Sequence, residues 1–247
     1  MSKRVMIASP VYDGGVRAEY MMTVIGIMEL LATQGVEREL FLRRGPLLHM
    51  NRNVIANRFL ERGCTHLLGL DTDISFDPKV IAQLLETGHD FQALACPFKE
   101  IQPVPVNADP ARLAPDFIAT TSRYNLRPLD EGGRVTVTRG SLRATAVGCG
   151  AFLITRAVLE RMIERRVVDR YRTPAFFAPD YSGEHCHGFF DYVRENDDIW
   201  GEDYSFSHRW VNGCGGEIWC RVDADVSHTG PVGITGRYEK KLAAGVV

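Results

Sequence analysis

The first hundred residues alternate short apolar runs with amphipathic patterns, and this alternation restricts the fold more than any other feature. The runs expected to form strands are residues 4–12, 36–42, 66–70 and 90–98. The segments with apolar side chains at the helical spacing of three and four are residues 20–34, 51–63 and 77–88. This order predicts an α/β domain with a mostly parallel central sheet and helices on both of its faces.

Local signals support the second and third of these helices. Asn51 or Asn53 is expected to cap the second helix, and Pro78 suits the first turn of the third. Gly63 and Gly88 are placed to end the two helices.

The pattern is looser from Lys99 to about Arg143, where five prolines lie between Pro103 and Pro128. A small hairpin is expected at residues 131–140. The later elements expected are a strand, a Gly-Cys-Gly turn and a helix in residues 144–166, a helix in 201–216, a last strand in 217–222 and a glycine-rich loop from residue 223, which could fold back over a site.

Composition and charge exclude several classes of protein. The 247 residues suffice for one domain with a substantial core. The net charge of -2 gives no overall attraction to nucleic acid or to an anionic membrane. No apolar run approaches the roughly 18–20 residues of a membrane span, and the first apolar segment is too short for a secretory signal. The six cysteines are scattered without a CxxC pair, so we expect reduced thiols in a cytoplasmic protein.

Two carboxylates, Asp71 and Asp73, follow directly on the buried run at residues 66–70. Ligands of open α/β sheets bind at the carboxyl ends of the strands, and alternation directs both side chains to one side if the strand direction continues. Neighbouring carboxylates repel each other, and their burial is costly unless a cation compensates. This predicts a Mg²⁺ or Mn²⁺ site that can also hold a diphosphate, although turn and capping contacts would explain the same residues.

Other residues have the right chemistry for a site. Glu202 and Asp203 open a predicted helix, where acidic residues favour the helix N-terminus and could also act in catalysis. The stretch His185-Cys186-His187 contains possible metal ligands, but the spacing fits no common structural zinc pattern. We expect this aromatic segment near an acceptor instead.

Several stretches carry a resemblance to a known family: ASPVY, NRN, LLGLDTDISFDP, VGCGAFLITRAVLERM, GEDYSFSHRWVNGCGGEIW and DVSHTG. They resemble the nucleotide-diphospho-sugar transferases of the GT-A fold, above all the small family 2-type glycosyltransferases and their phage-encoded relatives. The stretches follow the family's order over most of the chain, and residues 201–230 are the most specific part. The resemblance implies one GT-A domain over residues 1–247, with a nucleotide-sugar-binding half at 1–98 and an acceptor-binding half at 99–247.

The resemblance also implies how the donor is bound. The residues expected at the nucleotide sugar are Pro10, Tyr12, Asp13, Arg52, Asn53, Asp71, Thr72 and Asp73. Asp73 would be the main ligand of a Mn²⁺ or Mg²⁺ ion, Asp71 would meet the ribose or the metal, and His228 would be a late metal ligand. A UDP-sugar is the favoured donor. Strand-end packing, helix capping and a structural histidine are the alternative explanations of these residues.

On the acceptor side, Asp203 is expected to be the general base of an inverting transfer, with Glu202 beside it. In a retaining transfer Asp203 would instead position the acceptor or stabilise positive charge on the sugar. Acceptor contacts are expected from Lys99, Gly150 and Trp200. The acceptor would carry a hydroxyl group.

Three other functions compete with this prediction. A nucleotidyltransferase would use the same fold, and Gly14, Gly15 and Arg17 weakly match its glycine-rich loop. A non-catalytic module could bind a sugar without transferring it. A transferase acting on a modified base in phage DNA would work in the host cytoplasm and would have to reach an extruded base.

Overall fold

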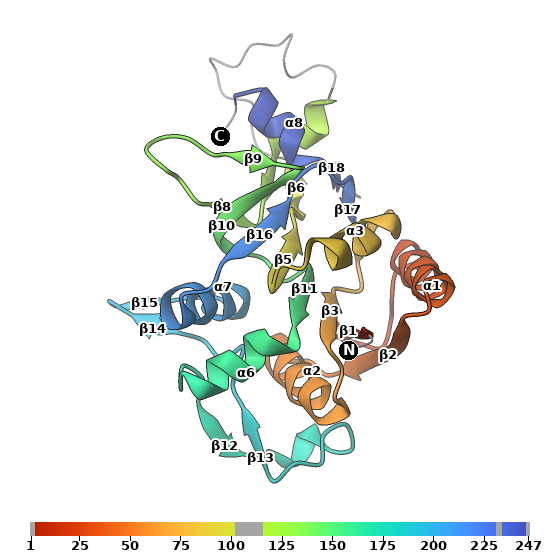
Figure 1. Cartoon of the computed structure of the whole chain (residues 1–247), viewed down its shortest axis with the longest axis vertical. Coiled ribbons are helices and arrows are strands. Elements are labelled where there is room, and N and C mark those ends of the chain that lie inside the picture. The colour runs from red at the N-terminus through yellow and green to blue at the C-terminus, as the bar shows by residue number, and fades with distance from the viewer. Residues whose placement is uncertain (1–2, 102–115, 231–233, 246–247) are drawn as a thin grey trace.

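The computed structural model describes residues 3–101, 116–230 and 234–245, and within them a nine-stranded mixed sheet forms the centre of the molecule (Figure 1). Its strand order is β2-β1-β3-β11-β5-β16-β10-β8, and β9 pairs with β10. The strands are β1 (Arg4–Val11), β2 (Glu37–Arg44), β3 (His66–Leu70), β5 (Phe91–Leu94), β8 (Leu126–Pro128), β9 (Val137–Thr138), β10 (Ser141–Val147), β11 (Ala151–Thr155) and β16 (Ile218–Arg221).

The helices and the smaller sheets surround this centre. The helices are α1 (Ala18–Thr33), α2 (Leu48–Arg62), α3 (Lys79–Thr87), α5 (Phe117–Thr121), α6 (Arg156–Glu164), α7 (Glu202–His208) and α8 (Tyr238–Ala243), with short turns at Ala175–Phe177 and Arg209–Gly213. The remaining strands are β4 (Ile74–Phe76), β6 (Pro97–Ile101), β7 (Ser122–Tyr124), β12 (Arg170–Arg172), β13 (His185–His187), β14 (Arg194–Glu195), β15 (Asp198–Ile199), β17 (Val226–His228) and β18 (Ile234–Gly236). Within the described ranges, no helix has the length and apolar character to cross a membrane.

The βα units predicted in the first hundred residues form, except that the strand expected at residues 90–98 splits into β5 in the central sheet and β6, which pairs with β7 in a separate sheet. Gly63 and Gly88 end α2 and α3 in the left-handed conformation, with φ of 68° and 72°. The predicted cap of α2 was wrong, because the helix begins at Leu48 and both asparagines lie inside it. The Asn51 amide instead donates to the Gly45 carbonyl at 2.7 Å and so fixes the loop that enters the helix.

The central sheet is mixed, which corrects the expectation of a mostly parallel sheet. The pairs β1–β2, β1–β3 and β5–β16 are parallel, but β11 lies antiparallel between β3 and β5. β11 was not predicted as a separate strand, because Ala151–Thr155 lies between the expected Gly-Cys-Gly turn and the expected helix. Residues 151–154 are buried on both faces, and a short apolar run without polar alternation does not distinguish a strand from the start of a helix.

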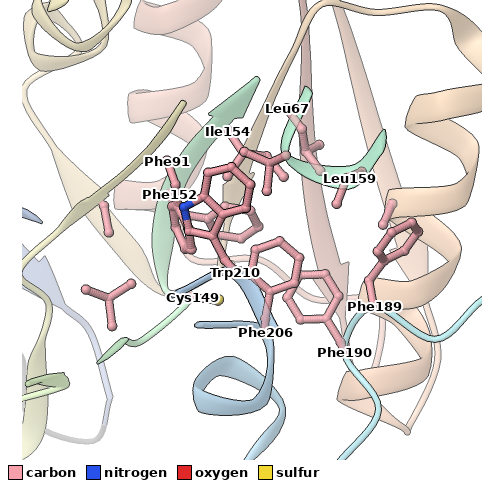
Figure 2. Close-up of a cluster of buried hydrophobic side chains, with 14 of the residues drawn as sticks. Leu67, Phe91, Cys149, Phe152, Ile154, Leu159, Phe189, Phe190, Phe206 and Trp210 are labelled. Atoms are coloured by element: carbon pink, nitrogen blue, oxygen red, sulfur yellow. The ribbon is translucent and has the colours of Figure 1, made fainter. Parts of the chain in front are cut away.

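Two hydrophobic cores lie on opposite faces of the sheet, as the prediction of helices on both faces requires. Val5 and Ile7 of β1 pack with α1 and α3, whereas Met6 and Ala8 belong to the core with α2, α6 and α7. Figure 2 shows the second core, where aromatic rings converge between the sheet and α7. The rings of Phe190 and Phe206 stack there with centroids 4.4 Å apart. This packing holds α7 against the sheet.

The hairpin expected at residues 131–140 lies further along the chain: β9 pairs with β10, which begins only at Ser141. The glycine-rich tail is more regular than expected: β17 pairs antiparallel with β4 and β18, and α8 follows. In this pairing His228 lies opposite Ile74, close to the paired aspartates. Residues 231–233 of the tail, and residues 102–115 of the loose middle segment with most of its prolines, lie outside the described residues.

Candidate functional site

Two adjoining cavities open where β1 and β3 end. One of about 320 Å³ is lined by Pro10, Tyr12, Gly45, Pro46, Leu48, Asn51, Asp71, Thr72, Asp73, Lys99 and His228. The other, of about 420 Å³, is lined by Tyr12, Asp13, Gly15, Val16, Arg17, Thr72 and Asp73. Both sit at the carboxyl ends of parallel strands, where α/β sheets bind ligands. Most residues that were predicted to contact the donor therefore surround a shared space.

The loop that carries the aspartates is held by backbone hydrogen bonds from three directions. The Asp71 amide donates to the Gly150 carbonyl at 2.8 Å, and the Arg17 amide donates to the Thr72 carbonyl at 3.1 Å. The Thr229 amide donates to the Asp73 carbonyl at 2.8 Å. Gly150 thus contributes its backbone to the site, and the loop is fixed before any ligand arrives.

Just before this loop, Gly69 allows β3 and β11 to pack closely. A Cβ atom at Gly69 would lie only 2.1 Å from Cε1 of Phe152, so any side chain would displace this ring. The Phe152 ring belongs to the core beneath the site (Figure 2). The glycine in the sequence HLLGLDTD therefore determines how close the second core comes to the aspartates.

The two aspartates have different partners. Both carboxylate oxygens of Asp71 accept from Nη2 of Arg52, at 2.9 and 3.0 Å. Asp73 instead pairs through Oδ2 with the Lys99 ammonium, and its Oδ1 lies 3.3 Å from Nε2 of His228. Burial alone would raise the pKa of Asp73, but His228 and Lys99 outweigh it and hold the pKa at about 2. Asp73 is therefore charged at neutral pH.

Arg52 connects Asp71 to the start of α7. Its Nη1 donates to Oε1 of Glu202 at 2.5 Å, its Nη2 also reaches the Cys149 carbonyl at 3.2 Å, and the residue is only 4% exposed. Burial would lower the pKa of Arg52, but the Asp71 and Glu202 carboxylates raise it above its ordinary value. The guanidinium is thus a permanent buried cation beneath the cavity rather than a group in its wall.

Glu202 and Asp203 are neighbours with different surroundings. Burial raises the pKa of Glu202, although Arg52 opposes this effect. Asp203 is partly buried and accepts from the Asn125 amide at 2.8 Å through Oδ2, while Oδ1 accepts from the Tyr204 backbone amide at 2.7 Å. The Asp203 carboxylate is therefore oriented by neutral donors, whereas the Glu202 carboxylate pairs with the charged Arg52.

Several predicted residues lie apart from the cavities. The Asn53 side chain is fully buried, donates to Asp191 at 2.6 Å and accepts from the Phe190 amide at 2.8 Å, so it joins α2 to the aromatic segment. Trp200 packs edge-on against His208 at 4.5 Å, on α7. Neither residue lines either of the two cavities. Lys99, which was expected to contact the acceptor, lines one of the two cavities and pairs there with Asp73.

Asn125 is a site residue that sequence reasoning missed. It lies between β7 and β8, and its backbone carbonyl also accepts from the Gly148 amide at 2.8 Å. A lone asparagine in an irregular segment carries no spacing signal. Only the fold brings it to Asp203, 78 positions later in the chain.

Asp73 and His228 fit two positions around one divalent ion. Nδ1 of His228 donates to the Pro97 carbonyl at 2.8 Å, because a carbonyl can only accept. Nε2 is therefore the ring nitrogen that faces Asp73 and is left to bind a metal ion. Metal-binding histidines commonly donate a hydrogen bond to a carbonyl or carboxylate from the ring nitrogen that does not bind the metal. Asp71 is occupied by Arg52, and among the described residues no group of three or more His, Cys, Asp or Glu side chains could hold a metal ion. Such an ion would need further ligands from a diphosphate or water.

Comparison with known proteins supports the fold only. No protein-family model matches the sequence, and no curated protein matches it. The structure of A197 from STIV is similar at 15% identity and a TM-score of 0.50, over 94% of each chain. A glycosyltransferase involved in the glycosylation of the major capsid of PBCV-1 matches at 15% identity over 66% of this chain and 65% of its own. Its TM-score of 0.34 is too low to support a functional argument.

Proposed function

We propose that this chain is a GT-A-type glycosyltransferase that moves a sugar from a nucleotide-diphosphate donor to a hydroxyl acceptor. The observation that carries the proposal is the placement of Asp73 and His228 in an open cavity at the strand ends. Arg52 connects the same strand end to the acidic start of α7. The Arg52 contacts thus link the candidate donor site to the helix that carries the candidate base.

The cavity offers different chemistry for the two parts of a donor. Tyr12 is 75% exposed at the rim and has an aromatic face on which a base can stack, beside Pro10. Asp73 and His228 would hold a Mn²⁺ or Mg²⁺ ion, which neutralises charge on the departing diphosphate. The preference for a UDP-sugar rests on the family resemblance alone.

Asp203 is the proposed general base. In an inverting reaction its carboxylate takes the proton of the acceptor hydroxyl, and the acceptor oxygen forms a bond to the anomeric carbon. The bond from this carbon to the diphosphate oxygen breaks, and its electron pair leaves with the diphosphate. Asn125 orients the carboxylate through Oδ2, while Glu202 is engaged by Arg52 and serves to position α7. In a retaining reaction Asp203 would position the acceptor.

The proposal is tested with labelled UDP-, GDP- and dTDP-sugars and Mn²⁺, by measuring release of the nucleoside diphosphate. Asp203→Asn should lower the rate by about 10²- to 10⁴-fold, because it removes the base, while donor binding is retained. Asp198→Asn, on the exposed strand β15, is the control and should leave the rate unchanged. Equal rates for Asp203→Asn and the unmodified protein would contradict the proposal.

A nucleotidyltransferase is the second candidate, because Gly15 and Arg17 line the adjoining cavity together with Asp73. Such an enzyme would bind a nucleoside triphosphate there and would release pyrophosphate. The two functions are separated by the product: nucleoside diphosphate from a nucleotide sugar, or pyrophosphate from a triphosphate.

A further inference from the structure

Lys99 occupies the part of the site where a cation is needed. Its ammonium group pairs with Oδ2 of Asp73, while His228 approaches the other oxygen at 3.3 Å. All three side chains line the same cavity. Both oxygens of this carboxylate therefore have a partner from the chain itself, and a divalent ion that binds Asp73 meets Lys99 as a competitor.

The exposure of Lys99 distinguishes it from the other cation of the site. Arg52 is only 4% exposed, and its guanidinium is fixed between two carboxylates and a backbone carbonyl. The Lys99 side chain is 35% exposed and has a flexible four-carbon stem, and Asp73 is its one charged partner among the described residues. An exposed ion pair of this kind contributes about 1 kcal/mol or less, so the ammonium can leave the carboxylate at little cost.

A divalent ion and the ammonium cannot share Asp73 without strong repulsion. Like charges a few ångströms apart repel each other by several kcal/mol at the edge of a protein, and the ion needs the lone pairs that the ammonium now uses. The Asp73 carboxylate can exchange the Lys99 ammonium for a divalent ion, because either cation neutralises its charge.

We propose that Lys99 is the built-in counter-cation of the Asp73–His228 pair and that a divalent metal binds by displacing it. The proposal deepens the proposed function, on whose metal site it rests. Displaced from Asp73, the ammonium needs a new anionic partner, and a diphosphate in the same cavity has the right charge. Metal and diphosphate should therefore strengthen each other's binding, since a coupling between two ligands is reciprocal. This assigns Lys99 to the donor side of the site rather than to the acceptor.

The test is Mn²⁺ binding by the purified full chain without nucleotide, measured from the electron paramagnetic resonance signal of free Mn²⁺. Lys99→Met should bind Mn²⁺ at least about tenfold more tightly than the unmodified protein, because its competitor is gone. Lys99→Arg keeps the positive charge and should stay near the unmodified affinity. Adding Asp73→Asn to Lys99→Met should abolish the gain, which places the measured ion at this carboxylate.

Arg17→Met is the matched control for general charge. Arg17 lines the adjoining cavity with Asp73, and the ion pairs found in the described residues include none between these two side chains. Its removal should change Mn²⁺ affinity by less than about threefold at physiological ionic strength, because separated charges are screened. Urea unfolding of each metal-free variant checks that it is folded.

Three results would overturn the proposal. The first is equal or weaker Mn²⁺ binding by Lys99→Met, including no binding by either protein. The second is an equal gain in Arg17→Met, which would reduce the effect to net charge. The third is a gain that survives Asp73→Asn, which would place the ion elsewhere. None of these measurements involves a nucleotide sugar, so failure of the exchange and failure of the transferase proposal are distinguishable.

Discussion

Asp71 and Asp73 are separated by one residue and line the same cavity, yet they pair with different partners. Asp71 belongs to a closed network, in which buried Arg52 joins it to Glu202 at the start of α7. Asp73 faces an open cavity, where its partners are a half-exposed lysine and a histidine. A pair of aspartates at this spacing is thus no guarantee of two equivalent metal ligands. Here the Asp71 carboxylate stabilises the fold through Arg52, and the Asp73 carboxylate is available to exchange its cationic partner.

The closed network should matter for stability and the open one for ligand binding. A buried cation cannot lose its partners cheaply, because no water replaces them. The partners of Asp73 are accessible to solvent, so water and ions can take their place. Removing single partners from each region tests whether this difference is real.

The largest effect on stability is expected from Arg52→Met. The change leaves the Asp71 and Glu202 carboxylates without their shared cation and should lower the free energy of unfolding by about 3 kcal/mol. Arg62→Met, on the same helix, is the control. Its side chain is 47% exposed and pairs with Glu39 at 3.2 Å, so the loss should stay below about 1 kcal/mol. Urea unfolding of both variants measures the difference, and similar losses would contradict the closed network.

A smaller effect is the pH dependence of that loss. Burial raises the pKa of Glu202 above 4.5, and removing Arg52 takes away the main opposing charge, so the pKa should rise further. The folded variant then holds a proton that the unfolded chain has released, and its stability falls as pH rises through this window. The difference in unfolding free energy between Arg52→Met and the unmodified protein should therefore increase by about 1–2 kcal/mol from about pH 4 to about pH 7. A gap that is constant or larger at low pH would oppose this explanation.

The smallest effect separates the two aspartates themselves. Asp71→Asn leaves buried Arg52 with one carboxylate and should cost about 1–2 kcal/mol of unfolding free energy. Asp73→Asn, whose partners Lys99 and His228 can turn to solvent, should cost less than about 1 kcal/mol. Thermal or urea unfolding of the two variants side by side decides the matter. Equal losses would mean that the two carboxylates are not as different as their partners suggest.

The first hundred residues could be predicted because their patterns are local. The strand at His66–Leu70 and the helix after Pro78 are set by apolar spacing, a proline and a glycine close together in sequence. The position of β11 could not be predicted. Its residues are buried by strands and helices from distant parts of the chain, so its sequence has no period of its own.

In the candidate site too, some features could be predicted from the sequence and others could not. Pro10, Tyr12 and Asp71 line one cavity, because the carboxyl ends of neighbouring parallel strands meet at one edge of the sheet. Asn125 and the pairing of Lys99 with Asp73 gave no signal in the sequence. A single asparagine or lysine that belongs to no sequence motif has many possible partners until the fold selects one.

The sequence by itself thus determined that carboxylates would stand at the end of a buried strand, and that an acidic pair would open a later helix. The tertiary structure alone decided which cation each carboxylate meets. Arg52 reaches Asp71 across 19 positions and Glu202 across 150. Spacing along the chain sets the direction of a side chain relative to its own backbone. Charge pairing depends on distance in the folded molecule, which only the packing of the whole sheet and its helices establishes.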